Sequence, residues 1–357
     1  MQPSHSFVYE AHASRVVFGT GASNQVAAEV EKLGAGRAIV LCTPNQKAEA
    51  TRISDLLGPL SAGIYAGAIM HVPVEAAREA VARARGAGAG CAVAIGGGST
   101  TGLGKAIALE TGMPVVAIPT SYAGSEMTPI YGLTEAGQKK TGRDLRVLPR
   151  TVIYDPALTV GLPAGLTVTS GLNAIAHAAE GLYARDTNPV MSLMAEEGIR
   201  ALASGIPAVI RAPADLDARA QCLYGAWLCG TVLGSVGMAL HHKLCHTLGG
   251  SFNLPHAETH TIVLPHVLAY NASAAPEAMA RIQRAIAATG QSAAAGLFDL
   301  AANNGVPVAL RDIGMCEQDL DRAADIALAN PYWNPRPIER EPIRALLQAA
   351  FDGLRPA

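Results

Sequence analysis

Short apolar runs alternate with amphipathic segments along the first part of the chain. Apolar runs of about four to eight residues are typical of buried strands, whereas apolar positions three or four apart indicate helices. The predicted strands are 37–43, the first part of 91–99, 114–120 and 150–156, and the predicted helices are 74–88 and 101–111. Residues 6–11 and 15–21 are predicted to form an early β-hairpin. The alternation favours an α/β fold with a mainly parallel, doubly wound sheet.

Beyond residue 160 the spacing of apolar positions is helical throughout. The segments 166–184, 190–212, 218–234 and 276–290 have the length and period of helices. We therefore expect an α/β dinucleotide-binding domain over residues 1–160 and an all-α catalytic domain over residues 161–357. A ligand is expected in the cleft between them, at the carboxyl ends of the strands.

Composition narrows the class of protein. The net charge is −2 and the chain has no basic block, which argues against binding to nucleic acid or to a membrane surface. No uninterrupted apolar run reaches the roughly 18 residues of a membrane-spanning helix. The N-terminus lacks the charged-then-apolar pattern of a secretory signal, and the six cysteines are scattered without a CxxC pair. We expect a cytoplasmic protein with reduced cysteines.

A glycine-rich stretch, AIGGGSTTGLGK at residues 94–105, lies between a predicted strand and a predicted helix. Glycines let a phosphate approach the backbone closely, and the helix that follows offers unpaired N–H groups and a positive dipole end. We expect a diphosphate at Gly96, Gly97, Gly98 and Ser99; the alternative is a tight strand-to-helix turn without a ligand. The stretch is not a P-loop, because Ala106 replaces the Ser or Thr that binds magnesium, and it is not G-x-G-x-x-G.

The end of the first parallel strand carries no acid. Dinucleotide sites often place a carboxylate there, which binds the adenosine ribose and repels a 2′-phosphate. Thr43 and Asn45 follow the strand instead, and both side chains can hydrogen-bond a ribose or a phosphate. We therefore expect a nicotinamide cofactor, NADH or NADPH, with weak discrimination between the two.

Six of the ten histidines fall between residues 241 and 266. His242 and His246 share one face of a predicted helix, which is expected to end at Gly249–Gly250 and to leave His256 in a loop. A single buried histidine is usually a core residue, but this density in a chain with 16% charged residues favours a functional site. The metalloprotease motif HExxH is absent.

A second stretch, GLNAIAHAAEG at residues 171–181, places Asn173 and His177 one helical turn apart. Imidazoles suit Zn²⁺ and Fe²⁺, and a carboxylate usually completes such sites. Asn173 offers a neutral amide, which is a poor ligand for a transition metal. From these residues alone the stretch is a metal site, a former metal site, or a helix packed against its neighbour.

Several motifs occur in a characteristic order: FGTGA, GGGS before a helix, AIPTSYAGSEMTP (117–129), GLNAIAHAAEG, and HHKLCHTLGG followed by LPH. Over nearly the whole chain this order resembles the iron-containing (group III) alcohol dehydrogenases and the related glycerol dehydrogenases and dehydroquinate synthases. The resemblance implies the dehydroquinate synthase-like fold, an α/β dinucleotide domain followed by a helical domain. It also implies a homodimer.

In the metal-using members of that family, one Asp and three His bind the ion. The resemblance places those positions at Asn173, His177, His242 and His256. The three histidines match, and Asn173 stands where the family has the Asp. This change, together with GGGSTTGLGKAIAL, PTSYAGSEMTPIYGLTE and NPYWNPRPI (330–338), resembles one branch of the family, the maleylacetate reductases. That branch reduces the carbon–carbon double bond of maleylacetate to 3-oxoadipate with NADH or NADPH and without a metal, in microbial breakdown of aromatic compounds.

The resemblance implies roles for further residues. Either His242 or His246 is expected to donate to the substrate's carbonyl oxygen or to protonate the enolate carbon, with His177, His256 and Asn173 shaping the pocket. The family's contacts to the nicotinamide and ribose correspond to Thr120, Ser121, Ser125 and Lys140. A substrate with two carboxylates needs cations, for which Lys243 and Arg336 are the candidates, Arg336 with the alternative of a surface role. Chlorinated maleylacetates are possible substrates, with loss of chloride.

Three alternatives stay open. A metal-dependent alcohol or glycerol dehydrogenase of the same family fits if Asn173 still permits Zn²⁺ or Fe²⁺ to bind. A dehydroquinate synthase-like cyclase would need more Lys and Arg near the histidines than this sequence has. A scaffold without enzyme activity would not need so many histidines beside a phosphate loop.

Overall fold

The computed structural model describes residues 7–12, 14–70, 72–135 and 138–357. These residues form two compact units. The α/β unit comprises Ala11–Leu162 and Ala214–Leu223, and the helical unit comprises Pro163–Pro213 and Tyr224–Ala357 with the described residues before Ala11.

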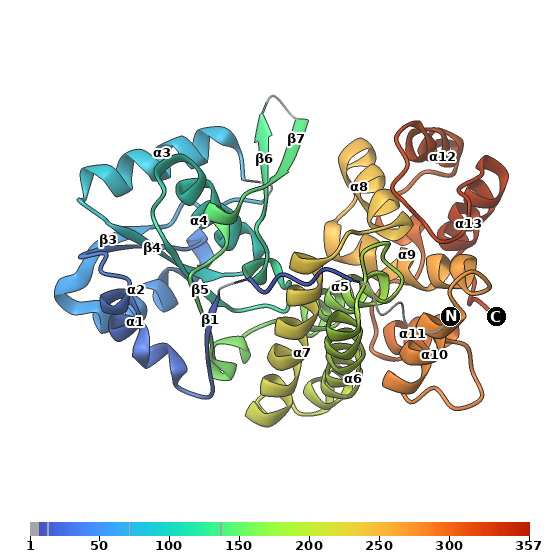
Figure 1. Cartoon of the computed structure of the whole chain (residues 1–357), viewed down its shortest axis with the longest axis horizontal. Helices are drawn as coiled ribbons and strands as arrows, with labels where there is room; N and C mark the ends of the chain where they lie inside the picture. Colours follow the sequence, from blue (N-terminus) through green and yellow to red (C-terminus); the bar gives the residue numbers. More distant parts are fainter. Residues whose placement is uncertain (1–6, 13, 71, 136–137) are drawn as a thin grey trace. The chain divides into compact units, whose positions relative to one another are not determined.

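A six-stranded sheet, entirely parallel in the described residues, forms the centre of the α/β unit (Figure 1). Its strand order is β1-β8-β5-β4-β2-β3. The strands are β1 (Arg15–Phe18), β2 (Ala38–Leu41), β3 (Ser61–Tyr65), β4 (Cys91–Gly96), β5 (Val115–Pro119) and β8 (Thr151–Tyr154). The chain moves outward from β2 to β3 and in the opposite direction from β4 to β5. The boundary between β2 and β4 is therefore a topological switch point, where α/β sheets bind ligands at the carboxyl ends of the strands.

Helices cover both faces of this sheet (Figure 1). On one face lie α1 (Val26–Lys32) and α2 (Lys47–Leu57), and on the other lie α3 (Val74–Gly86) and α4 (Gly98–Thr111). Alternate strand residues serve the two faces: Val40 and Val93 pack toward α1 and α2, whereas Ile39 and Ala92 pack toward α3 and α4. Burial on both faces explains the continuous apolar runs, and the predicted doubly wound α/β fold is confirmed.

Two predictions about strands need correction. The expected early hairpin is wrong, because residues 7–11 carry no strand and β1 pairs in parallel with β8, Val16 opposite Val152. Ser6 of that prediction lies outside the described residues. A short apolar run fits a local or a distant partner equally well, so its pattern alone does not choose. The sequence also failed to indicate β3 and an antiparallel ribbon of β6 (Ile130–Glu135) and β7 (Gln138–Arg143).

The helical unit contains no strand in its described residues, as predicted. Its helices are α5 (Ala164–Leu182), α6 (Pro189–Arg211), α7 (Leu216–Ser235), α8 (Leu240–Phe252), α9 (His256–Asn271), α10 (Pro276–Ala285), α11 (Ala293–Asn303), α12 (Leu320–Ala329) and α13 (Arg340–Asp352). The first residues of α7 belong to the α/β unit. No single helix in the described residues is long and apolar enough to span a membrane; α7 and α8, bent by 95°, meet the criteria only as a pair and only by length and composition.

The region around α8 differs from the prediction. The helix does not end at Gly249–Gly250 but continues to Phe252, and Asn253 then adopts the left-handed conformation with φ 54°. A helical glycine costs only about 1 kcal/mol, and Leu244 and Leu248 bury their side chains in a core shared with α9, α12 and α13. His256 is consequently the first residue of α9 rather than part of a loop. All six cysteines are free, as their scattered spacing predicted.

Candidate active site

The glycine loop of the α/β unit connects β4 directly to α4. Gly96 has φ 151°, and a Cβ there would lie 2.5 Å from Thr100 Oγ1. Gly98, the first residue of α4, is exposed, and a Cβ there would meet nothing nearer than Ala123 Cβ at 4.0 Å. Gly96 is thus required by the backbone, whereas Gly98 leaves open space over the helix N-terminus. This open N-terminus has the N–H groups and dipole that a diphosphate needs.

The carboxyl ends of β2, β4 and β5 are joined by a chain of hydrogen bonds. Thr43 Oγ1 donates to Gln46 Oε1 at 3.1 Å, Gln46 Nε2 donates to Thr120 Oγ1 at 2.8 Å, and the Thr120 N–H donates to the Gly96 carbonyl at 3.0 Å. The predicted residues Thr43, Thr120 and Gly96 therefore lie together at the switch point. Gln46, which connects them, was missed, since a polar residue after a strand gives no specific sequence signal.

Lys105 on α4 holds the loop that follows β5. Its ammonium donates to Ser125 O at 2.7 Å, Thr128 Oγ1 at 2.9 Å and Ile130 O at 2.7 Å. The side chain is 1% exposed, and burial lowers the pKa of Lys105 to about 7, opposed by the charge of Glu126. Lys105 thereby fixes the position of Ser125, one of the predicted nicotinamide contacts. Lys105 ends the glycine-rich stretch, but no role was predicted for it from the sequence.

The remaining predicted cofactor residues are more exposed. Ser99 and Ser121 are half-buried, and Asn45 is exposed next to Thr43. Lys140 lies on β7, where its ammonium pairs with Glu135 on β6 at 2.7 Å. The resemblance places this lysine near the cofactor ribose, and that assignment stays a prediction.

Three helices bring the polar cluster of the helical unit together. Asn173, His177 and Glu180 recur on one face of α5 because their spacing is close to one and two helical turns. His242 from α8 lies with its ring centroid 5.1 Å from that of His177 and 5.0 Å from that of His260 on α9. His241 and His256 complete the cluster, with centroids 4.9 Å and 4.2 Å from that of His260.

Several polar atoms in this cluster lack a hydrogen-bond partner within the described part of the chain. They are Asn173 Oδ1, His177 Nδ1, His242 Nε2 and both ring nitrogens of His260. All four side chains are at most 5% exposed. Buried polar groups are normally paired, so a set of unpaired atoms from three helices indicates a place where a ligand or ordered water binds. Predicted residues supply three of the four side chains, and His260 is the addition.

Burial sets the charge of these histidines. It lowers the pKa of His177, His242 and His260 well below the ordinary value, and the neighbouring imidazoles lower each further. His241 has its pKa lowered to about 4, again chiefly by burial. The buried part of the cluster is therefore neutral at pH 7 and binds by single N–H donors and lone pairs.

The exposed side of the cluster is formed by His246 and His256, which are both exposed. His246 Nδ1 lies 3.2 Å from the Tyr332 hydroxyl, and the Lys243 ammonium lies 5.9 Å from the centre of the Tyr332 ring. The structure thus brings the predicted residues Lys243 and His246 together at Tyr332. Tyr332 lies in the NPYWNPRPI stretch that pointed to the family branch, but no chemistry was assigned to it.

Arg336, the second candidate for binding the substrate carboxylates, contacts other residues of the helical unit. Its guanidinium lies 4.1 Å from the centre of the Tyr270 ring and donates to the Tyr270 carbonyl at 2.9 Å. Asn334 Nδ2 also donates to the Arg336 carbonyl at 2.8 Å. These contacts give the half-buried Arg336 a role that neither interpretation named, because they fasten the segment after α12 to α9.

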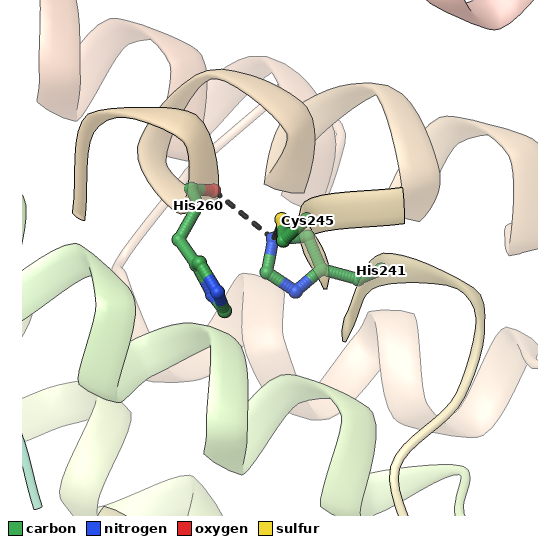
Figure 2. A group of neighbouring side chains, drawn as sticks. All are labelled: His241, Cys245 and His260. Atoms are coloured by element: carbon green, nitrogen blue, oxygen red, sulfur yellow. Dashed lines mark hydrogen bonds between the residues drawn. The ribbon is translucent and has the colours of Figure 1, made fainter. Parts of the chain in front are cut away.

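The donor set of this cluster differs from that of an iron site. Iron sites of this kind include a carboxylate, whereas the matching positions here offer three imidazoles and the neutral amide of Asn173. A second group, His241, Cys245 and His260, has ligand atoms within 4.8 Å of one another (Figure 2). There the His241 Nε2 faces the His260 carbonyl at 3.0 Å and must donate to it, and burial raises the pKa of the Cys245 thiol. Neither of these two sets supplies an anionic ligand. A third group, Glu180, His241 and His242, includes a carboxylate, but both of its oxygens already accept hydrogen bonds from backbone N–H groups around the start of α8.

Comparison with known proteins shows which protein family the chain resembles. It matches the model of iron-containing alcohol dehydrogenases over residues 13–156 and the C-terminal model of the same family over residues 167–351. A maleylacetate reductase of Burkholderia cepacia is 61% identical over 99% of this chain and 100% of its own length. A crystal structure of maleylacetate reductase from Agrobacterium tumefaciens is 57% identical with a TM-score of 0.95, covering 100% of both chains.

A further crystal structure, from Ralstonia eutropha JMP134, is 83% identical with a TM-score of 0.98 and covers 99% of this chain and 100% of its own. Its name gives alcohol dehydrogenase as a provisional activity. Members of the family use NAD(P)H, which agrees with the open glycine loop at the switch point. From the ordered motifs, the fold and these matches, the chain belongs to the iron-containing alcohol dehydrogenase family.

Proposed function

We propose that this chain is a maleylacetate reductase, which reduces the carbon–carbon double bond of maleylacetate to 3-oxoadipate with NADH or NADPH. Relatives with that name are 51% to 61% identical over nearly its full length. The observation within the site that carries the proposal is Asn173. It lies one turn before His177 on α5 with an unpaired amide oxygen in the described residues, where the resemblance places a carboxylate in the metal-using enzymes of the family.

The chemistry explains why this reaction tolerates a neutral amide. An alcohol dehydrogenase needs a Lewis acid to stabilise an alkoxide. Maleylacetate is an enone with two carboxylates, and a nicotinamide held at the glycine loop would supply hydride to the carbon β to the ketone. The two electrons of the hydride form the new C–H bond, and the π electrons move to give a delocalised enolate. Hydrogen-bond donors stabilise an enolate, and a proton on its carbon then completes 3-oxoadipate.

The proton is proposed to come from His246. This side chain is exposed, so solvent can restore its proton after each turnover. Its ring is hydrogen-bonded to the Tyr332 hydroxyl. His242 and His177 stay neutral in the buried part of the pocket and orient the substrate. Lys243 is the proposed partner of a substrate carboxylate, since the Arg336 guanidinium is already used by Tyr270.

The cofactor side rests on the glycine loop and the strand ends. Gly96, Gly97, Gly98 and Ser99 are proposed to hold the diphosphate, with Thr120, Ser121, Ser125 and Lys140 toward the nicotinamide and ribose. The segment after β2 contains Thr43 and Asn45 but no acid, so NADH and NADPH should have similar values of kcat/KM. A preference for NADH by orders of magnitude would contradict this assignment.

The test is to add maleylacetate and NADH to enzyme that has been depleted of metal by a chelator and dialysis. The nicotinamide absorbance is expected to fall, and the product should be 3-oxoadipate by mass spectrometry. Absence of NADH oxidation with either nicotinamide cofactor would refute the function. His246→Ala should lower kcat by about 10²- to 10⁴-fold, the usual share of a general acid, with little change in NADH affinity.

A metal-dependent alcohol dehydrogenase is the second candidate. It is favoured by the name of the Ralstonia relative and by the hydrogen bond from His242 Nδ1 to a carboxylate, an arrangement common behind metal-ligating histidines. One assay distinguishes the two functions. If the enzyme oxidises simple alcohols, and if a chelator abolishes this activity and Zn²⁺ or Fe²⁺ restores it, the result would support this candidate against the metal-free reductase.

We further propose a homodimer, on the family resemblance alone, and a cytoplasmic location, on the scattered cysteines. Light scattering coupled to size-exclusion chromatography should give twice the 36.7 kDa mass of the chain. A monomer at micromolar concentration would refute the dimer.

A further inference from the structure

The last turn of α5 carries a glutamate that belongs to none of the positions the family resemblance assigned. Glu180 is 0% exposed and lies seven residues beyond Asn173 on the same helix. A carboxylate so deeply buried needs several donors to balance its lost hydration. The first residues of α8 provide them, and one of these donors is the His242 ring.

Four hydrogen bonds reach the Glu180 carboxylate. The backbone N–H of His241 donates to Oε1 at 2.7 Å, and that of Ala239 donates to Oε2 at 2.8 Å. The N–H of His242 makes a longer contact with Oε2 at 3.4 Å, and the His242 ring places Nδ1 2.8 Å from the same oxygen. Because backbone N–H groups can only donate, they occupy both carboxylate oxygens as acceptors. They stabilise the ionised carboxylate, which has no proton to donate, so His242 Nδ1–H donates to Glu180.

The neighbouring imidazole leads to the same assignment of the proton. His241 Nε2 lies 3.0 Å from the His260 carbonyl, which only accepts, so His241 carries its proton on Nε2 (Figure 2). Its Nδ1 then holds a lone pair, 3.5 Å from His242 Nδ1. Both groups next to His242 Nδ1 are thus acceptors. With one proton per neutral ring, His242 Nε2 holds a lone pair, and this is the atom without a partner in the described residues.

We propose that Glu180 is a positioning residue, which fixes His242 in the Nδ1–H tautomer and turns the lone pair of its Nε2 toward the ligand-binding cluster. Nε2 then accepts a hydrogen bond from the group or water that carries the proton for the substrate. Glu180 also ties the start of α8 to α5, so that one carboxylate sets both the tautomer and the place of the ring. The role in turnover rests on the proposed reductase function, whereas the tautomer does not.

The first test reads the tautomer in the wild-type enzyme. Histidine ring nitrogens labelled with ¹⁵N differ in chemical shift between N–H and lone-pair states, and His242→Ala identifies the signals of His242 by their loss. The expected result is a protonated Nδ1 and an unprotonated Nε2 at pH 7.5. A proton on Nε2 overturns the proposal, whether or not the enzyme reduces maleylacetate. This test needs no altered Glu180 and stays valid if variants there fail to fold.

The second test uses Glu180→Gln, which keeps the shape but replaces one acceptor by an amide donor. We expect kcat with maleylacetate to fall about 10- to 100-fold, as for other residues that orient a reactive histidine, while the KM for NADH stays unchanged. In a His242→Ala background the same substitution should cost little further, because Glu180 acts through His242. Equal losses of kcat in both backgrounds would overturn the proposal.

A matched control separates orientation from simple attachment of the loop. Asp186 accepts a hydrogen bond from the Gly237 N–H at 2.9 Å and so also ties the segment after α5 to the segment before α8. Unlike Glu180, it has no hydrogen bond to a histidine ring within the described part of the chain. Asp186→Asn should lower Tm without lowering kcat. If it lowers kcat as much as Glu180→Gln does, attachment of the segment explains the effect and the positioning role is refuted.

Discussion

His266 offers a test of the physics that keeps the histidine cluster neutral, outside the cluster itself. It lies on α9, is 5% exposed, and has no hydrogen-bond partner for Nε2 in the described residues. Burial lowers the pKa of His266 from 6.5 to about 4. The substitution His266→Leu replaces the ring by an apolar side chain of similar volume. It should make the protein less sensitive to acid.

The sign follows from comparing the folded and unfolded chains. Above about pH 6.5 the imidazole is neutral in both states and contributes no pH dependence. Below this value the unfolded chain binds a proton that the folded chain excludes, so stability falls with pH until the folded pKa is reached. A shift from 6.5 to about 4 corresponds to roughly 2 kcal/mol at pH 5 and roughly 3 kcal/mol at pH 4. Either value is a large part of the usual 5–15 kcal/mol of a folded protein.

The assay is urea unfolding followed by circular dichroism at pH 7.5 and at pH 5, for the wild type and for His266→Leu. The wild type should lose about 2 kcal/mol more than the variant between the two pH values. Any packing cost of leucine is present at both pH values and cancels in this difference. Equal losses in the two proteins would show that His266 takes up its proton without unfolding, and the reasoning from burial would be wrong.

Three further changes test the sites. Gly98→Ala should leave Tm unchanged or raised, since its Cβ meets open space, yet weaken NADH binding measured by fluorescence titration; unchanged binding would refute the phosphate assignment. Asn173→Asp should retain Zn²⁺ through dialysis, measured by mass spectrometry of the metal, whereas Asn173→Ala should not. Lys105→Met removes three charge-assisted hydrogen bonds, so the free energy of unfolding in urea should fall by about 3 kcal/mol or more. The KM for NADH should also rise. A stable variant with a normal KM would exclude the role of Lys105 in holding the loop.

The sequence by itself determined the local elements and the order of the chemistry. Continuous apolar runs specified strands buried on both faces, and the glycines of 96–98 marked the turn into α4, because these signals depend only on nearby residues. The spacing of Asn173 and His177 placed them on one helical face for the same reason. The ordered motifs identified the family, and the two family models match residues 13–156 and 167–351.

Only the tertiary structure decided which distant groups meet. β1 finds its partner in β8, Gln46 links Thr43 to Thr120, and Lys105 reaches the loop after β5; each contact joins segments that no local pattern connects. The same holds for Glu180, which lies inside the stretch that drew attention to Asn173. Its role depends on the backbone of α8, some 60 residues further along, donating to a buried carboxylate. Hydrogen bonds and burial are properties of the packed chain, and the sequence shows them only after its segments have been brought together.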